Sequence, residues 1–308
     1  MPGRTFSRRA VLASGTSAAM AVATPIISPA FGQTKALTAA DVLARMRVNI
    51  GTEWREGGVD RFIAGSADMP VRGIATTMMA TFDALKAAAA QNLNLVITHE
   101  PTYWSHQDRL DQLQDDPLYK KKLAFIQAHG LIVYHFHDHW HAKRPVDGIN
   151  DGMARKMGWT GYRDTTNGRQ YNLPATTLAG LMRSFQSRLK DRTLRAVGDP
   201  ALAVRKVVTS WGFSSNFPGI TFLKGDADVL VVGEAQDWDL VAYAQDLAGA
   251  GRKKGLVLLG HVLSEQWGMD ACADWLAQLV KEVPVRFLPL IEPYWNPSRP
   301  VFEINTRI

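Results

Sequence analysis

The stretch "VRGIATTMMATFDALKAAAAQNLNLVITHEP" (residues 71–101) predicts a strand–helix–strand unit. Its apolar runs at 71–80 and 93–101 are strand-like, and the segment 81–91 between them has a helical pattern. The same alternation continues, with strands predicted at 131–137, 204–212, 227–234, 255–261 and 283–290, and helices at 115–130, 148–159, 176–189, 239–251 and 268–283. This alternation is typical of an α/β protein with largely parallel or mixed sheets.

The length of 308 residues is enough for one large α/β domain or two smaller ones. The turn-rich segment "TGYRDTTNGRQYN" (160–172) marks the expected boundary. We therefore expect a first α/β lobe over residues 33–162 and a second over residues 163–308, with the C-terminal part packing back on the first lobe.

The N-terminal segment has the features of an export signal. "SRRAVL" (7–12) closely resembles the twin-arginine motif, and the uncharged segment 10–31 that overlaps it is interrupted by two prolines, so it makes a poor membrane anchor. Ser28-Pro29-Ala30 offers a small-x-small cleavage site. We expect residues 1–32 to be a signal peptide and the protein to be exported to the periplasm; an uncleaved anchor is the alternative.

The charge distribution and the cysteine content argue against several classes of function and site. The net charge of +6 comes with basic runs that are short and separated ("YKKK", 119–122, and "GRKK", 251–254), which argues against nucleic-acid binding. The single cysteine, Cys272, excludes an intramolecular disulfide and a thiolate zinc site, and its apolar helical surroundings indicate a core residue.

Histidines are concentrated in "VYHFHDHWHAK" (133–143), where positions 135, 137, 139 and 141 alternate. On one extended strand all four would point to the same side, yet four ligands from one strand cannot surround a metal ion. Further ligands must come from elsewhere, and the carboxyl ends of parallel strands converge on one edge of a sheet. Candidates at the other predicted strand ends are His99, Glu100, Glu234, His261 and Glu265.

Each of these candidates also has an ordinary structural explanation. A single histidine after a strand is more often a hydrogen-bonded core or surface residue, and Glu234 could cap the following helix. Gly268 predicts that the last helix starts after His261 and Glu265. These two side chains would then share a face only if the residues before Gly268 make a helical turn of their own. Together, imidazoles and carboxylates without thiolates suit Zn, Fe or Mn.

Tryptophans follow several of these positions. Trp104, Trp140 and Trp267 are candidate walls of a substrate pocket, and Trp211 and Trp238 lie at two further strand ends. Packing in the core is the alternative explanation for each of them.

Several blocks of the chain resemble, in order, those of the Nif-three-like dinuclear metal centre family, often labelled type 2 GTP cyclohydrolase I. The first block is "VRGIATTMMATFDALKAAAAQNLNLVITHEPTYW", whose family counterpart ends in Thr-His-His-Pro, and the second is "GLIVYHFHDHWHAKRPVDGINDGMARKMGW". The later blocks are "LRAVGDPALAVRKVV", "ADVLVVGEAQDWD" and "GLVLLGHVLSEQWGMDACADWL". The resemblance covers most of residues 41–290.

This resemblance implies two α/β lobes, two metal ions in a cleft between them, and a ring-shaped hexamer. The family's ligands match His99, His261 and Glu265 directly. The second histidine of the family's pair is Glu100 here, and its aspartate falls on His141 if His137 matches the family histidine. Asp138 and His139 are the alternatives for another register.

We therefore expect an exported metal-dependent hydrolase with two divalent ions per chain (Zn, Fe or Mn). Its substrate would be a small, aromatic or cyclic, amide-like or ester compound attacked by a metal-activated water. Glu100 or Glu234 would be the general base, whichever is not a ligand. A mononuclear non-haem iron enzyme and a non-catalytic metal-binding protein are the alternatives, and we expect a homo-oligomer.

Overall fold

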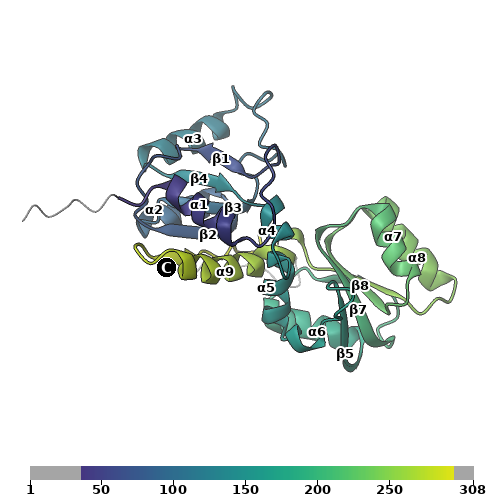
Figure 1. Cartoon of the computed structure of the whole chain (residues 1–308). Coiled ribbons are helices and arrows are strands. Elements are labelled where there is room, and N and C mark those ends of the chain that lie inside the picture. The colour runs from purple at the N-terminus through teal and green to yellow at the C-terminus, as the bar shows by residue number, and fades with distance from the viewer. Residues whose placement is uncertain (1–35, 295–308) are drawn as a thin grey trace, which may run out of the picture. The chain divides into compact units, whose positions relative to one another are not determined.

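The computed structural model describes residues 36–294 and contains two five-stranded sheets (Figure 1). The first sheet has the order β1-β4-β3-β2-β10, in which β10, β2, β3 and β4 are parallel and β1 is an antiparallel edge strand. Its strands are β1 (Arg61–Ala64), β2 (Ile74–Met79), β3 (Leu95–Glu100), β4 (Ile132–His135) and β10 (Val285–Phe287).

Helices of the first lobe begin where the sequence provides caps. Thr38 forms a capping box with Asp41, Thr81 accepts a bond from the Ala84 amide, and Asp116 precedes a proline at the first helical position. The helices are α1 (Ala39–Asn49), α2 (Phe82–Ala90), α3 (Pro117–Ala128), α4 (Asp138–Ala142) and α5 (Gly148–Met157).

The second sheet has the order β5-β7-β8-β9-β6, with β7, β8 and β9 parallel and antiparallel strands at both edges. Its strands are β5 (Gln170–Thr177), β6 (Arg195–Val197), β7 (Ala203–Phe213), β8 (Val229–Glu234) and β9 (Gly255–Leu258). The accompanying helices are α6 (Leu178–Leu189), α7 (Asn216–Lys224) and α8 (Ala242–Gly249), with short turns η1 (Thr160–Tyr162) and η2 (Asp237–Val241).

Helix α9 (His261–Leu279) touches strands of both sheets and packs along α5. The two helices meet at glycines, since a Cβ on Gly152 would lie 2.2 Å from the Trp267 carbonyl oxygen and one on Gly268 would lie 2.4 Å from Ile149. After α9 the chain returns to the first sheet, where β10 pairs with β2.

The predicted α/β class with two lobes and mixed sheets is confirmed. The predicted start of the last helix is wrong: α9 begins at His261, not 268. Gly268 lies inside the helix because α5 needs room there, so His261 and Glu265 do share a helical face, one turn apart. The predicted strand at 131–137 ends at His135, and α4 takes up the rest of the histidine run.

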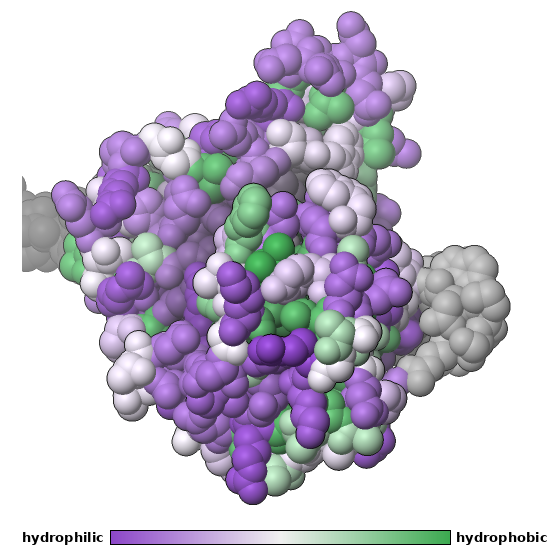
Figure 2. Space-filling model, turned by 90° about the vertical axis from the view of Figure 1, so that its right-hand side faces the viewer, coloured by the Kyte–Doolittle hydropathy of each residue, from purple (hydrophilic) through white to green (hydrophobic). Residues whose placement is uncertain are grey.

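Buried aliphatic side chains of the central strands form the core, and Cys272 of α9 is buried against them. Burial raises the pKa of the Cys272 thiol. The face shown in Figure 2 is mainly hydrophilic, with hydrophobic residues in small separate groups. None of the helices within residues 36–294 has the length and apolar character needed to cross a bilayer. The predicted signal peptide, residues 1–32, lies outside the described residues.

Candidate metal centre

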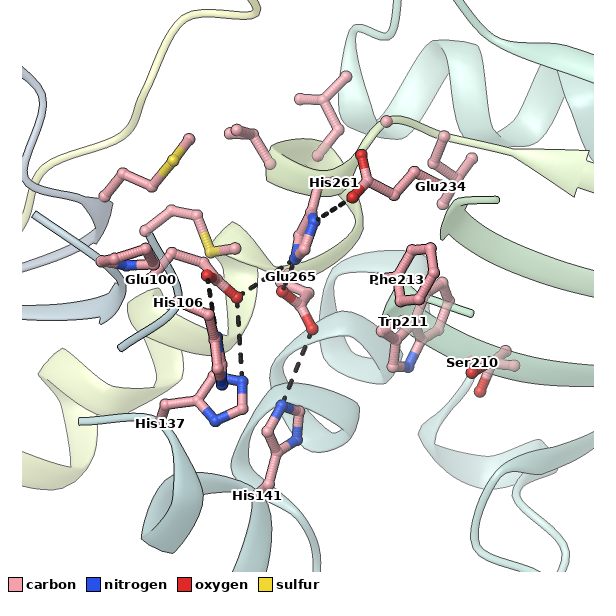
Figure 3. Close-up of a pocket in the computed structure, with 18 of the residues that line it drawn as sticks. Glu100, His106, His137, His141, Ser210, Trp211, Phe213, Glu234, His261 and Glu265 are labelled. Carbon is pink, nitrogen blue, oxygen red and sulfur yellow. Dashed lines mark hydrogen bonds and ion pairs between the residues drawn. The ribbon is translucent and has the colours of Figure 1, made fainter. Parts of the chain in front are cut away.

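Six residues predicted as ligands come together at the carboxyl edge of the first sheet, and Figure 3 shows all of them except His99. His99 and Glu100 end β3, and His137 follows β4. The other three lie on helices: His141 is on α4, and His261 and Glu265 are on the first turns of α9. Except for His99, which is fully buried behind them, they line a pocket of about 800 Å³.

Glu265 is the centre of this cluster. Its Oε2 lies 3.1 Å from Nε2 of His261 and 3.7 Å from Nε2 of His99, and its Oε1 lies 3.8 Å from Nε2 of His141. Oε1 of Glu100 is 3.3 Å from Nε2 of His261 and 3.9 Å from Nε2 of His137. Six donor residues from four segments of the chain thus point at one another.

The four histidines share one arrangement, in which Nδ1 is bound to an oxygen and Nε2 faces the cluster. Nδ1 of His99 lies 3.4 Å from the Phe136 carbonyl, and Nδ1 of His137 lies 3.0 Å from Asp138 Oδ1. Nδ1 of His141 is 2.9 Å from Asp147 Oδ2, and Nδ1 of His261 is 3.1 Å from Glu234 Oε1. In a neutral ring, an acceptor at Nδ1 fixes the tautomer with a lone pair on Nε2, which is the arrangement found in metal-binding histidines. His261 would reach this form when an ion replaces its second proton.

The electrostatics of the site attract a cation. Burial disfavours the charged form of His261, but the nearby carboxylates of Glu100, Glu234 and Glu265 outweigh it and raise the pKa of His261 to about 12. Burial likewise opposes ionisation of Glu100, yet the bond to His261 leaves its pKa below the ordinary value. Burial and two neighbouring imidazoles lower the pKa of His99 well below its ordinary value. A neutral His99 beside carboxylates that require a positive charge suits a divalent ion.

Two buried atoms of the cluster lack a hydrogen bond. They are Nε2 of His99 and Oε2 of Glu265, whose side chains are 0% and 3% exposed. Leaving such atoms unpaired costs roughly 1–3 kcal/mol each. A metal ion would satisfy both, and the imidazole and carboxylate donors fit Zn, Fe or Mn.

Glu265 reaches the cluster because β7 ends in a glycine turn. Gly212 has a φ of +73°, and a Cβ there would lie 2.5 Å from Oε1 of Glu265. Any side chain at this position would displace the central carboxylate of the site.

The remaining histidines of the run at 133–143 have structural partners instead. His135 is fully buried, with Nε2 2.9 Å from the carbonyl oxygen of His99. Nδ1 of His139 lies 2.6 Å from Asp60 Oδ2, and its ring stacks on Trp54. Among the alternatives from the sequence, His141 therefore joins the cluster, whereas Asp138 and His139 do not.

The predicted tryptophan walls are only partly right. Trp104 lines the pocket and is 53% exposed, but Trp140 and Trp267 do not line it. Trp140 is 1% exposed, and its Nε1 donates to the Gly268 carbonyl, 3.1 Å away. Trp267 packs on Phe287 beneath Lys156. Trp140 on α4 and Trp267 on α9 thus pack in the contacts around α9 and not in the pocket.

The second sheet supplies the aromatic wall. Trp211 and Phe213 at the end of β7 line the pocket on the side away from Glu100 and His137 (Figure 3). Nε1 of Trp211 donates to Oδ1 of Asn150, 2.9 Å away, which fixes the indole. The sequence predicted that Trp211 lies at a strand end. That its side chain lines the pocket could be seen only in the three-dimensional structure.

Three further polar residues near the cluster were missed as site residues from the sequence. Asp147 orients His141, Arg169 is the only lysine or arginine among the described lining residues, and His106 lies beside Glu100. The only sequence signal for His106 was its position six residues after Glu100, in the loop that follows β3.

Comparisons with known proteins agree with this architecture. A curated relative, a GTP cyclohydrolase 1 type 2 homolog of Clostridium acetobutylicum, is 24% identical over 166 residues, which span 50% of this chain and 60% of the relative. The fold resembles Staphylococcus aureus hypothetical protein SA1388, with a TM-score of 0.68 and 14% identity over 85% of this chain and 99% of that one. A Bacillus cereus protein related to NIF3 matches with the same TM-score and identity, over 85% and 100%.

A family model matches most of the chain. It is described as Duf34/NIF3 (NGG1p interacting factor 3) and covers residues 42–293, a range that contains every candidate ligand. The resemblance seen in the sequence is thereby confirmed, and the chain belongs to the Duf34/NIF3 family.

Proposed function

We propose that this protein is an exported metal-dependent hydrolase for small aromatic or cyclic substrates with an amide-like or ester bond. Its metal ions would be held by His99, Glu100, His137, His141, His261 and Glu265. Divalent ions bound there would lower the pKa of a water toward ~7 and stabilise developing negative charge on the substrate.

The observation that carries this proposal is the shared orientation of the four histidines. Each has an oxygen acceptor at Nδ1 and presents Nε2 to the carboxylates of Glu100 and Glu265. A structural histidine such as His139 has partners within the protein at both ring nitrogens, whereas these four turn Nε2 to carboxylates. In metal centres, outer partners at Nδ1 set the basicity and direction of the ligand.

The number of donors favours two ions over one. A mononuclear non-haem iron enzyme needs two histidines and one carboxylate, whereas this site presents four imidazoles and two carboxylates. A protein that only binds or stores metal has no need of a roughly 800 Å³ pocket with an aromatic wall beside the ligands.

Glu234 is the better candidate for the proton acceptor. Glu100 lies within the donor cluster, with a side chain 12% exposed, and would be occupied as a ligand. The Glu234 side chain is 51% exposed, and one oxygen orients His261, which leaves the other oxygen to take a proton from the attacking water. The hydrogen bond to His261 lowers the pKa of Glu234, so this base is ionised at neutral pH.

The proposed substrate class is based on the pocket residues that face the metal ligands. Trp211 and Phe213 offer flat apolar surfaces, and Arg169 offers a single positive charge. One arginine suits a neutral or singly charged compound better than a nucleoside triphosphate, which several basic groups usually hold. The name of the Clostridium relative supports an enzyme, and the single arginine of the pocket supports a less highly charged substrate than GTP for this chain.

Export and assembly are part of the same proposal. The twin-arginine motif supports transport of the folded protein to the periplasm, and the family resemblance supports a homo-oligomer, specifically a hexamer. Amino-terminal sequencing of periplasmic material and the mass of the purified protein in solution would test both.

The decisive experiment is elemental analysis of the purified mature protein, its His99→Ala and His261→Ala variants, and a His129→Ala control. We expect two ions per chain in the wild type and the control, and loss of most metal in the two site variants. Full metal content in both site variants would contradict the ligand assignment. One iron per chain with oxygen-dependent turnover would favour the mononuclear alternative, whereas hydrolysis of small aromatic amides, esters or cyclic compounds would support the hydrolase.

A further inference from the structure

A cluster at the outer side of the metal centre contains a histidine that the family resemblance does not supply. His106 lies in the loop after β3, and its Nδ1 is 4.0 Å from Oε2 of Glu100. The other oxygen of Glu100 is 3.9 Å from Nε2 of His137, and the rings of His106 and His137 are 5.0 Å apart (Figure 3). The ligand-type atoms of these three residues all lie within 4.8 Å of one another.

These separations fit a cation position. An ion with bonds of about 2.1 Å in a tetrahedral site holds its ligand atoms roughly 3.4 Å apart, so small side-chain rotations would close this cluster around it. The His137 ring also stacks on His99, with centroids 4.6 Å apart, which places the cluster next to the buried part of the site. Oε1 of Glu100 faces His261 and His137, and Oε2 faces His106, so this carboxylate lies between the inner and outer parts of the centre.

The loop that carries His106 is anchored on both sides of it. The backbone amide of Tyr103 donates to Oδ1 of Asp108, 2.6 Å away, and the Gln107 carbonyl accepts a bond from Arg61. Oδ2 of Asp108 faces Nδ1 of His135 at 3.5 Å, and both side chains are buried. The His106 side chain itself is 56% exposed, so a fixed backbone presents a solvent-accessible imidazole to Glu100.

We propose that His106, Glu100 and His137 form the second cation position of this protein, with His106 as a ligand delivered by the loop after β3. In this chain a carboxylate, Glu100, stands where the resembling family has the second histidine of its pair, and His106 would restore an imidazole to that side. The proposal rests on the proposed metal centre and names one ligand beyond it.

The test is a Zn²⁺ titration of metal-free mature protein by calorimetry, with elemental analysis after desalting, for the wild type and His106→Gln. We expect two ions per chain in the wild type. In His106→Gln one tight ion should remain, and the affinity for the second should fall by more than the roughly 10–100-fold that loss of an outer partner costs. Co²⁺ loading gives an independent readout, because the variant should lose the visible absorption of the second ion.

His129→Gln is the matched control, since His129 is an exposed histidine at the end of α3 that stacks on Phe125. It should bind two ions as the wild type does. Thermal unfolding of metal-free His106→Gln should match the wild type, because the side chain is exposed.

The outcomes separate this inference from the proposed function. Two ions in His106→Gln with unchanged affinities would overturn the role of His106 and leave the metal centre standing. A wild type with a single tight ion would overturn the second position and the two-ion part of the proposed function, but not the ligand cluster itself. A wild type that binds no ion would overturn both proposals.

Discussion

At the pocket, the carboxyl edge of the first sheet presents Glu100 and His137, with His99 buried behind them, whereas that of the second presents Trp211 and Phe213. The first group is buried or nearly so, and its nitrogens are fixed by hydrogen bonds. Phe213 in the second group is half-exposed. The difference indicates a division of labour: rigid polar groups hold ions in fixed positions, while exposed aromatic surface is left for a substrate.

Glu234 is the residue that couples the two walls, since it ends β8 of the second sheet and binds His261 of the cluster. Glu234→Gln keeps an oxygen for Nδ1 of His261 but removes the proton acceptor. We expect kcat to fall by roughly 10²–10⁴-fold at saturating metal, with metal content retained. Steady-state kinetics and elemental analysis measure both quantities. Asp237→Asn, an exposed change three residues further on, is the control, and an unchanged kcat in Glu234→Gln would remove Glu234 from the chemistry.

Replacing Trp140 tests whether this aromatic residue, which is next to the ligand His141, belongs to the core or to the pocket. Its ring fills the space above Gly148 and packs on Phe136 and Trp275. Trp140→Ala should destabilise the metal-free protein by about 3–5 kcal/mol because it leaves a large cavity. Urea unfolding measures this loss. A variant with wild-type stability and a raised KM would instead restore Trp140 as a pocket wall.

Lys122 supports the loop that follows β3, next to the metal ligands. Its Nζ donates to the Thr102 carbonyl and lies over the ring of Trp104. Burial lowers the pKa of Lys122 to about 8 from 10.5. The unfolded chain therefore binds more protons between pH 8 and 10.5, and this residue makes stability rise with pH in that window. Below pH 8 both states are protonated, and the burial cost stays constant at about 3 kcal/mol.

Lys122→Met removes this charge, so it should be more stable than the wild type by about 1–3 kcal/mol at pH 7. The gain should shrink as the pH rises from 8 toward 10.5. Urea unfolding at pH 7, 8.5 and 10 measures it, with Lys120→Met, an exposed lysine paired with Asp115, as the control. A difference that stays constant with pH would show that the Lys122 amine keeps its ordinary pKa.

Phe213 tests the aromatic wall directly. Phe213→Ala should raise KM about 5–10-fold, leave kcat nearly unchanged, and change stability by no more than about 0.5 kcal/mol, because the ring is half-exposed. Phe217→Ala is the matched control, since Phe217 is 74% exposed and does not line the pocket. Equal KM values for the two variants would mean that the aromatic wall does not meet the substrate.

Much of the fold could be predicted from the sequence because its elements are locally encoded. Apolar runs gave the central strands, and the caps Thr81 and Asp116 lie within a residue or two of the predicted helix starts. Short edge strands such as β1 and β6 were missed, because three or four half-buried residues carry too weak a pattern. The start of α9 was misjudged because Gly268 serves the contact with α5, which no local pattern reveals.

By itself the sequence determined the chemistry available to this protein: imidazoles and carboxylates at strand ends, a single cysteine, and tryptophans nearby. Only the tertiary structure decided which of these groups meet. His141 joins the cluster while His139 turns to Asp60, and Trp211 faces the pocket while Trp140 enters the core. The reason is physical: residue type sets what a side chain can bind, but its direction depends on where the strand ends and the helix begins.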